Sequence, residues 1–497
     1  MCDTCDIKAE ETIRYRLDQL RSADQMLRES VKSGEYAKIS EEIRTIQCKR
    51  HTWGWKIYLC FCTVVCSIRE RHFLRLLGNV AKGNLNAVKV ELLRSDRLKQ
   101  KIGVLESAKQ AAGGDVQQCV EKQQNAVLAI MDAYHSAKKK VLLFMAPYFS
   151  RERLADGYFQ RVQAIDRMIP EDHLRIYASW LDADSENGLP QVCIWDDAHI
   201  EIRYPHPDPI NDERIHQIAR RAEVVYHHSI TFANELVTRD TEIRKAFDMH
   251  GAYPEELRMY GRDAQAAIDE QQEKLAMEYG QCLICVTQSM ACHLAQKYGK
   301  IPEHVIILPI FDEDKLHRCM SLKKTQSPKS TVVYAGGMQK WQNVEKMQEA
   351  IHWTEGKFQF RIFTPEPDIF WKKWKYARKP REIQVCKKSP DAVVAAYAMC
   401  TYGFLLREDI VVNSVACPTK LVEYLAAGII PILDSPNIGD FVQDGMKYVS
   451  LSDFVSGRLP TEAEGNAYVS QNIEVVHKLE NRYQQGKLAL CAWLEQD

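Results

Sequence analysis

Several common functional signatures are absent from this sequence. Its 66 Lys and Arg nearly balance its 67 Asp and Glu, and the formal net charge is −1. No whole-molecule field therefore attracts nucleic acid, and we expect no nucleic-acid partner. Neither a GxGxxG nor a Walker A sequence occurs in the 497 residues. This absence argues against dinucleotide-dependent dehydrogenases and P-loop nucleotidases.

The sequence also lacks the cysteine pattern of a secreted or zinc-binding protein. Sixteen cysteines are scattered along the chain, and no secretory signal stands at its start. Free thiols in a reducing, cytoplasmic compartment are the favoured interpretation. Cys2 and Cys5 form a CxxC pair, but no second pair follows with ligand spacing, so incidental thiols are favoured over a metal site.

No apolar run is long enough to span a bilayer, which needs about 20 residues. The most apolar stretch, WGWKIYLCFCTVVC (53–66), is interrupted by Lys56 and followed by a basic run that ends at Arg75. A buried helix or hairpin is the favoured interpretation. The alternative is a peripheral contact through residues 53–75 with anionic lipid at the inner face of a membrane.

Residues 1–137 have a mainly helical pattern. Leu17, Leu20, Leu27 and Val31 keep the three-and-four spacing that gives a helix one apolar face. No catalytic group of residues stands out there. We expect an accessory helical domain for assembly into oligomers, membrane attachment or partner binding, separable from the rest of the chain.

The remaining chain alternates short apolar runs with helical stretches, which indicates parallel α/β architecture. We expect a first Rossmann-like domain at 138–311, a polar linker at 312–330, a second Rossmann-like domain at 331–465, and C-terminal helices at 466–497 that cross back to the first domain. A cleft between two such domains is the expected ligand site.

The strongest functional motif is CPTKLVEYLAAG (417–428). Pro418 suits the first turn of a helix, whose amides at Thr419, Lys420 and Leu421 would form an anion site, with added charge from Lys420. One turn later, Glu423 could accept hydrogen bonds from a ribose diol. The alternative is an ordinary helix with Glu423 as a surface acid.

A second motif, YAGGMQKWQN (334–343), places two glycines and a lysine after a predicted strand. Gly336 and Gly337 would let the backbone approach a ligand closely, and Lys340 could reach a phosphate. A Gly-Gly pair alone is weak evidence for a phosphate site. This motif therefore supports such a site only together with the motif at 417–428.

Together these segments resemble family 4 of the retaining glycosyltransferases, particularly bacterial members that build surface polysaccharides. The resemblance extends over about residues 140–455. It includes three further segments, RLADGYFQRVQAID (153–166), VVYHHSITFANEL (224–236) and DMHGAYPEE (248–256). It implies a GT-B fold, with two Rossmann-like domains facing a cleft.

The resemblance also implies residue roles. Lys340 and the amides at Thr419 to Leu421 would bind the donor diphosphate, and Glu423 would hold the ribose. His228 would lie near the transferred sugar and the acceptor, bordered by the loop at Asp156 and Gly157.

Two positions depart from the family pattern. Val415 stands where members usually carry a first glutamate, so sugar contacts would come from Asn413 or Arg407. Met338 replaces an arginine that many members have. Both changes leave open a degenerate, inactive member.

Polar residues in DMHGAYPEE form the candidate acceptor side, namely Asp248, His250, Glu255 and Glu256. A helix start that places acids near the positive end of its dipole is the alternative. We expect no metal: the ligand count is short here, and the Asp-Ala-Asp at 182–184 and the Asp-Glu-Asp at 312–314 are chance patterns in polar loops.

The resulting hypothesis is transfer of a sugar from a nucleoside-diphosphate sugar, UDP favoured over GDP, to a hydroxyl of a glycan or lipid-linked acceptor, with retention and without a cofactor. Two rivals stay open. One is a sugar-nucleotide epimerase on the same fold, and the other is a non-catalytic scaffold in a polysaccharide assembly complex.

Overall fold

The computed structural model describes residues 3–33, 114–181, 189–206, 208–325 and 329–496. The apolar run 53–66, its basic flank and the Asp-Ala-Asp at 182–184 lie outside these ranges. Within them, every helix is too short or too polar to cross a bilayer. The chain divides into two compact units, Met1–Leu143 with Glu171–Ala222, and Phe144–Pro170 with Glu223–Asp497.

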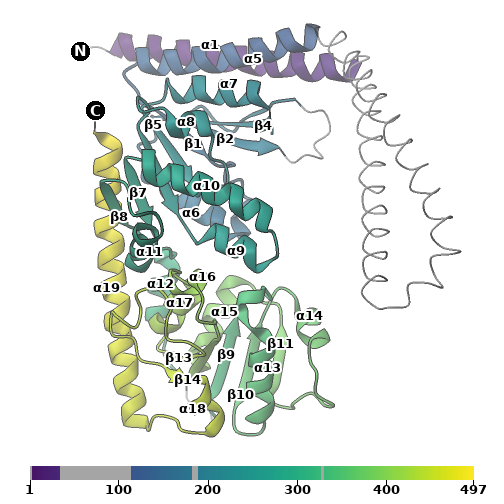
Figure 1. The fold of residues 1–497 in the computed structure, drawn as a ribbon, viewed down its shortest axis with the longest axis vertical. Coiled ribbons are helices and arrows are strands. Elements are labelled where there is room, and N and C mark those ends of the chain that lie inside the picture. The colour runs from purple at the N-terminus through teal and green to yellow at the C-terminus, as the bar shows by residue number, and fades with distance from the viewer. Residues whose placement is uncertain (1–2, 34–113, 182–188, 207, 326–328, 497) are drawn as a thin grey trace, which may run out of the picture. The chain divides into compact units, whose positions relative to one another are not determined.

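The first unit combines helices with a small sheet (Figure 1). Its elements are α1 (Asp3–Ser33), α5 (Gly114–Ser136), β2 (Leu174–Leu181), β3 (Gln191–Ile194), β4 (His199–Pro205) and α7 (Pro209–Ala219), and β1 (Val141–Met145) contains the unit boundary. The strand order is β3-β4-β2, with β2 parallel and β3 antiparallel to β4.

The described part of the helical segment 1–137 packs against this sheet. Apolar residues of α1 and α5 are buried, and Gln123 donates a hydrogen bond to Asp24 across the helix pair. Tyr204 on β4 donates to Gln124 on α5 at 3.0 Å, and both side chains are buried. Deleting residues 1–137 would therefore uncover core surface of the first unit.

The second unit contains parallel strands of two sheets. Four strands of one sheet follow one another in the order β5-β6-β7-β8, namely β5 (Val224–His228), β6 (Lys245–Met249), β7 (Cys282–Cys285) and β8 (His304–Ile307). Its helical segments are η1 (Arg153–Ala155), α6 (Gly157–Asp166), α8 (Glu235–Arg239), α9 (Tyr253–Met259), α10 (Asp263–Tyr279) and α11 (Gln288–Tyr298). β5, β6 and β7 are buried along their whole length, whereas β8 begins with the exposed residues His304 and Val305.

The other sheet has the order β11-β10-β9-β12-β13-β14. Its strands are β9 (Thr331–Ala335), β10 (Gln359–Phe363), β11 (Ile383–Cys386), β12 (Tyr402–Leu405), β13 (Ile430–Leu433) and β14 (Val449–Ser450). Its helical segments are η2 (Lys340–Gln342), α13 (Val344–Trp353), α14 (Pro367–Lys372), α15 (Pro390–Ala396), η3 (Tyr397–Met399), α16 (Val411–Ser414), α17 (Thr419–Ala426) and α18 (Leu451–Ser456). Gly403 on β12 admits the ring of Tyr424, because a Cβ there would lie 2.7 Å from it.

Part of the expected linker 312–330 is a helix. α12 (Glu313–Met320) begins at Asp312, whose side chain accepts a hydrogen bond from the Lys315 amide. Leu316 and Cys319 are buried against α17. The polar sequence concealed this packing because only one narrow face of the helix is apolar.

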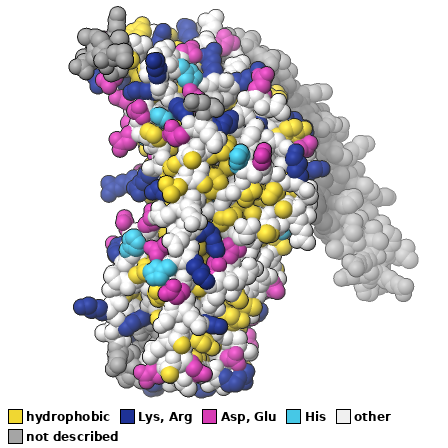
Figure 2. Space-filling view, turned by 90° about the vertical axis from the view of Figure 1, so that its left-hand side faces the viewer, with side chains coloured by type: hydrophobic (Ala, Val, Ile, Leu, Met, Phe, Trp, Pro, Cys, Tyr) yellow, Lys and Arg dark blue, Asp and Glu magenta, His cyan; other side chains and the backbone are white. Residues whose placement is uncertain are grey.

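The C-terminal segment forms one long helix, α19 (Glu462–Glu495), which begins with a capping box at Thr461 and Glu464. It runs beside both sheets of the second unit (Figure 1), and Gly486 passes so close to β8 that a Cβ would meet the Ile307 carbonyl at 2.3 Å. Figure 2 shows acidic and basic side chains interspersed on the face that it draws, as expected from the balanced composition.

Candidate functional site

The carboxyl end of β6 carries a buried charge pair. Arg161 on α6 donates two hydrogen bonds to Asp248, at 2.9 and 3.0 Å, and both residues are at most 2% exposed. Tyr226 donates a further bond at 2.9 Å. Burial alone would raise the pKa of Asp248, but the charges of Arg161 and His250 lower it below its ordinary value. Asp248 is therefore ionised, and its carboxylate is held in place by these hydrogen bonds.

Two histidines adjoin this carboxylate. Nε2 of His250 lies 3.2 Å from Asp248, and Nδ1 of His228 lies 3.9 Å from it. Burial lowers the pKa of His228 well below its ordinary value despite the opposing charge of Asp248. Neither ring nitrogen of His228 has a hydrogen-bond partner among the described residues. A neutral imidazole with two unused nitrogens thus ends β5.

The turn after β5 is strained. Ser229 has a φ of 68°, an uncommon value for a residue other than glycine. Its amide donates to the Asp248 carbonyl at 2.8 Å, which links the ends of β5 and β6. Tyr158 on α6 donates to the His228 carbonyl at 3.2 Å. Strain of this kind is concentrated at functional sites.

His228, Asp248 and His250 place potential metal-ligand atoms within 4.8 Å of one another. Three such ligands resemble a catalytic zinc site in number. However, both oxygens of Asp248 already accept from Arg161, and the guanidinium charge opposes a second cation. The contacts therefore favour hydrogen bonding by the neutral His228 over metal binding, and metal independence stays a prediction.

The two predicted acidic residues on α9, Glu255 and Glu256, have different surroundings. Burial raises the pKa of Glu256 from 4.5 to about 6, against the lowering effect of Arg407. Glu255 accepts from Lys297 at 2.7 Å, and although burial opposes it, hydrogen bonds from His293 and Lys297 lower its pKa to about 2. Glu255 thus belongs to an ion cluster, whereas Glu256 faces Arg407.

Arg407 follows β12 of the six-stranded sheet. Burial lowers its pKa to about 10, which leaves it charged at neutral pH. Its Nε has no hydrogen-bond partner among the described residues. Asn413 on α16 is fully buried and donates to the Glu408 carbonyl, while its Oδ1 also has no partner in the described ranges.

The glycine turn after β9 lies beside a tyrosine. Tyr334 donates to the Gly337 carbonyl, and a Cβ on Gly336 would lie 2.8 Å from the Tyr334 hydroxyl. Lys340 donates to the Met259 carbonyl at 2.9 Å. The predicted phosphate ligand therefore contacts α9 in this structure.

Glu423 is only 6% exposed, and its carboxylate already has partners. Lys315 approaches it at 2.7 Å and Lys420 at 2.8 Å. Tyr397 donates to it at 2.9 Å. Burial would raise the pKa of Glu423, but the two lysines lower it below its ordinary value. The alternative of a solvated surface acid is wrong, and the predicted ribose ligand is engaged by protein groups.

The start of α17 also differs from the expectation. The Lys420 ammonium is directed to Glu423, and the Leu421 amide donates to the Pro418 carbonyl at 2.9 Å. Of the three predicted anion-binding amides, that of Leu421 is therefore engaged by the protein itself. A local reverse turn competes here with anion binding.

Four further positions named in the sequence analysis have local structural surroundings that can be described. Val415 is 2% exposed, and its carbonyl accepts from Thr287 at 2.7 Å. Met338 joins the apolar core of the six-stranded sheet. Asp156 caps α6 by accepting from the Tyr158 amide, and space around Gly157 is open. Both departures from the family pattern are thus buried apolar contacts.

Sequence reasoning missed Arg161, Tyr226 and Lys315. A signal existed for the first: Arg161 precedes Val162 and lies four residues before Ile165, on the buried face of α6. A charged residue on an apolar face implies a buried partner. Nothing local pointed to Lys315, because its partner Glu423 is far along the chain.

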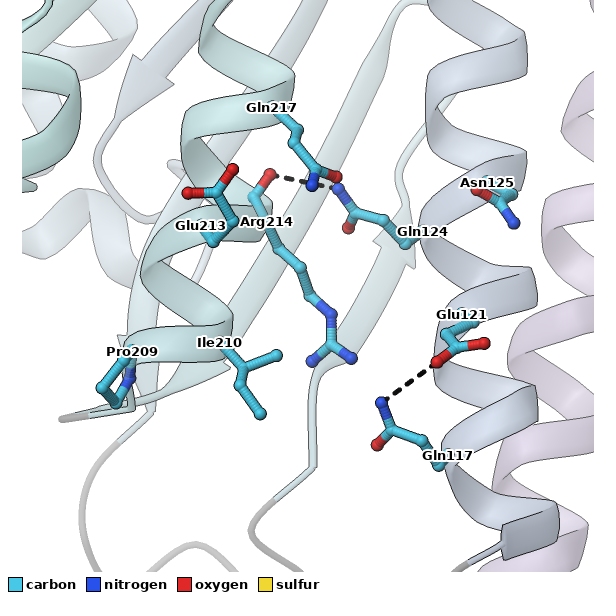
Figure 3. Close-up of a pocket in the computed structure, with 9 residues that line it drawn as sticks. All are labelled: Gln117, Glu121, Gln124, Asn125, Pro209, Ile210, Glu213, Arg214 and Gln217. Atoms are coloured by element: carbon cyan, nitrogen blue, oxygen red, sulfur yellow. Dashed lines mark hydrogen bonds between the residues drawn. The ribbon is translucent and has the colours of Figure 1, made fainter.

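A groove of about 580 Å³ lies in the first unit between α5 and α7 (Figure 3). Gln124 crosses it to donate to the Arg214 carbonyl at 3.1 Å. No sequence-predicted site residue lines it, and its walls are mainly amides and charges.

No protein-family model matches the chain, and no curated protein does. Among solved structures, HepE of Anabaena in complex with UDP has a TM-score of 0.50 and 10% identity, covering 71% of this chain and 100% of that one. A trehalose-6-phosphate structure from E. coli, bound with UDP-2-fluoro glucose, has a TM-score of 0.49 and 9% identity, covering 72% and 100%. At this identity the likeness to HepE concerns fold alone: the chain has a mixed α/β fold of GT-B type with parallel sheets and an N-terminal helical region.

Proposed function

We propose that this chain is a retaining glycosyltransferase of the family 4 type, which transfers a sugar from a UDP-sugar to a glycan or lipid-linked hydroxyl. One observation carries the proposal. Arg407 Nε, Asn413 Oδ1 and both nitrogens of His228 are buried without partners in the described part of the chain. All three residues lie at or beyond carboxyl ends of parallel strands, where α/β proteins bind ligands.

In this proposal the donor diphosphate is held by cations. Arg407 offers an unused guanidinium nitrogen. Lys340 exchanges its single bond to the Met259 carbonyl for a phosphate oxygen. These charges stabilise the departing nucleoside diphosphate, which is the main catalytic requirement of the reaction.

The acceptor side is formed by Glu256, His228 and His250. Because its pKa is lowered, His228 is uncharged, and it orients sugar hydroxyls by hydrogen bonds without adding a positive charge. Glu256, with its pKa raised to about 6, is ionised at neutral pH and accepts from an acceptor hydroxyl. The donor phosphate takes the acceptor proton, and no protein nucleophile is assigned.

A second candidate is a non-catalytic GT-B scaffold. The occupied carboxylate of Glu423 supports it, because a ribose would have to displace Lys315 or Lys420. Buried Val415 in place of the first family glutamate points the same way.

Thermal shift and calorimetry with UDP, GDP and a panel of their sugars separate the candidates. A ligand at 100 times its Kd should stabilise the native state by about 2.7 kcal/mol. Arg407→Gln should abolish most of that gain, whereas the exposed control Arg458→Gln should not. Transfer should then be assayed with and without chelator, where retained activity is expected. Absence of any nucleotide binding would support the scaffold.

A further inference from the structure

A strongly basic segment with interspersed aromatics lies at the edge of the six-stranded sheet. Between residues 367 and 388 the sequence holds eight Lys and Arg against Asp368 and Glu382. The segment includes α14 and ends with β11, which is the edge strand. Figure 1 shows both elements on the side of this sheet away from α19. The whole chain is charge-balanced, so this concentration is local.

Most of these cations are directed outward. Lys375 pairs with Glu345 at 2.6 Å and Arg378 with Glu355 at 3.4 Å. By contrast, Lys372, Arg381 and Lys387 are exposed and have no ion-pair partner among the described residues. Their charge is thus available to an external anion.

Aromatic rings hold the segment against the end of α13. Tyr376 stacks on His352 with ring centroids 3.8 Å apart, and Lys379 lies 4.2 Å over the ring of Trp371. Trp374 donates through Nε1 to the Arg378 carbonyl. These faces are covered by protein groups, whereas single-stranded nucleic acid binds by stacking bases on bare rings.

Two large apolar side chains on α13 and α14 are exposed. Trp353 at the end of α13 is 62% exposed, and Ile369 on α14 is 39% exposed. Exposed tryptophan and aliphatic side chains beside Lys and Arg are characteristic of surfaces that rest in a lipid headgroup layer.

We propose that this edge, defined by residues 367–388 with Trp353, docks on an anionic lipid bilayer. The cations would contact acidic headgroups, and Trp353 and Ile369 would enter the interfacial layer. The inference does not depend on sugar transfer, because it rests on surface charge and aromatic placement alone.

The test uses the full chain and sedimentation with vesicles of phosphatidylcholine, with and without 30% phosphatidylserine. The wild type should bind the anionic vesicles, and binding should weaken as salt rises. The triple variant Lys372→Gln, Arg381→Gln, Lys387→Gln should bind at least about tenfold more weakly. A matched control removes the same charge from exposed lysines elsewhere, Lys274→Gln, Lys323→Gln and Lys447→Gln, and should bind like the wild type.

Trp353→Ala tests the apolar part and should reduce the binding that survives at high salt. Three results would overturn the proposal. Equal binding by the triple variant would place the contact elsewhere, for instance at residues 53–75. Equal losses in both triple variants would show a general charge effect. Tighter binding of a single-stranded RNA than of anionic vesicles, lost in the same triple variant, would identify a nucleic-acid surface instead.

Discussion

Lys315 on α12 holds the carboxylate of Glu423 on α17, with Nζ and Oε1 2.7 Å apart. The two residues are more than a hundred positions apart in the sequence, and Lys420 approaches the same carboxylate. Donor binding at Glu423 must therefore replace a contact that the protein itself supplies. Whether a nucleotide can displace this contact therefore distinguishes a donor-binding role for Glu423 from a purely structural one.

Glu423→Gln should weaken UDP binding by about 1–3 kcal/mol if the carboxylate accepts from the ribose diol. The loss should shrink for a 2′,3′-dideoxy nucleotide, which has no diol to donate. Calorimetry with both nucleotides provides the comparison, with the exposed Glu349→Gln as control. Equal losses for the two nucleotides would assign Glu423 to the ion cluster alone.

Lys340→Ala should weaken nucleoside-diphosphate binding by about 1.5–3 kcal/mol, the contribution of a charge-assisted hydrogen bond. Stability should change little, because Lys340 is exposed and donates only to the Met259 carbonyl. Calorimetry of UDP and thermal unfolding measure the two effects separately. An unchanged affinity would remove Lys340 from the donor site.

Asp248→Asn should lower the free energy of unfolding by about 3–5 kcal/mol, because it leaves the Arg161 guanidinium buried without its counter-charge. Asp453→Asn is the matched control, since Asp453 pairs with Arg458 on the surface, where a pair contributes about 0–1 kcal/mol. Urea unfolding of both variants tests the contrast. Similar losses would mean that the buried ion pair of Arg161 and Asp248 contributes no more to the free energy of unfolding than the surface pair does.

Glu256 should make stability depend on pH. Its pKa is raised from 4.5 to about 6 in the folded protein, so the native state binds the proton more tightly than the unfolded state. This contribution is fully present below pH 4.5 and is lost as pH rises to about 6. Glu256→Gln should remove this contribution to the pH dependence and stabilise the protein by about 2 kcal/mol at pH 7.5.

Urea unfolding between pH 4.5 and 7.5, for the wild type, Glu256→Gln and the control Glu349→Gln, measures this slope. A variant that keeps the wild-type slope would show that another group is responsible.

The sequence by itself determined the local elements of this protein. Continuous apolar runs such as VLLFM (141–145) predicted buried strands, and their alternation with helical stretches predicted parallel sheets, because each signal is contained in neighbouring residues. The turn at Gly336 and Gly337 and the helix after Pro418 were identifiable for the same reason. These predictions needed no knowledge of distant contacts.

Only the tertiary structure decided how the charged groups pair. Asp248 was recognised as a polar candidate, but its partner Arg161 lies 87 positions away. Glu423 was predicted to bind a ribose, but in the structure its carboxylate forms an ion pair with Lys315 on another helix. Burial makes such pairing obligatory, since an unpaired charge is costly in the interior. Which residue becomes the partner of a buried charge depends on how the helices pack, and the spacing of residues in the sequence does not determine that packing.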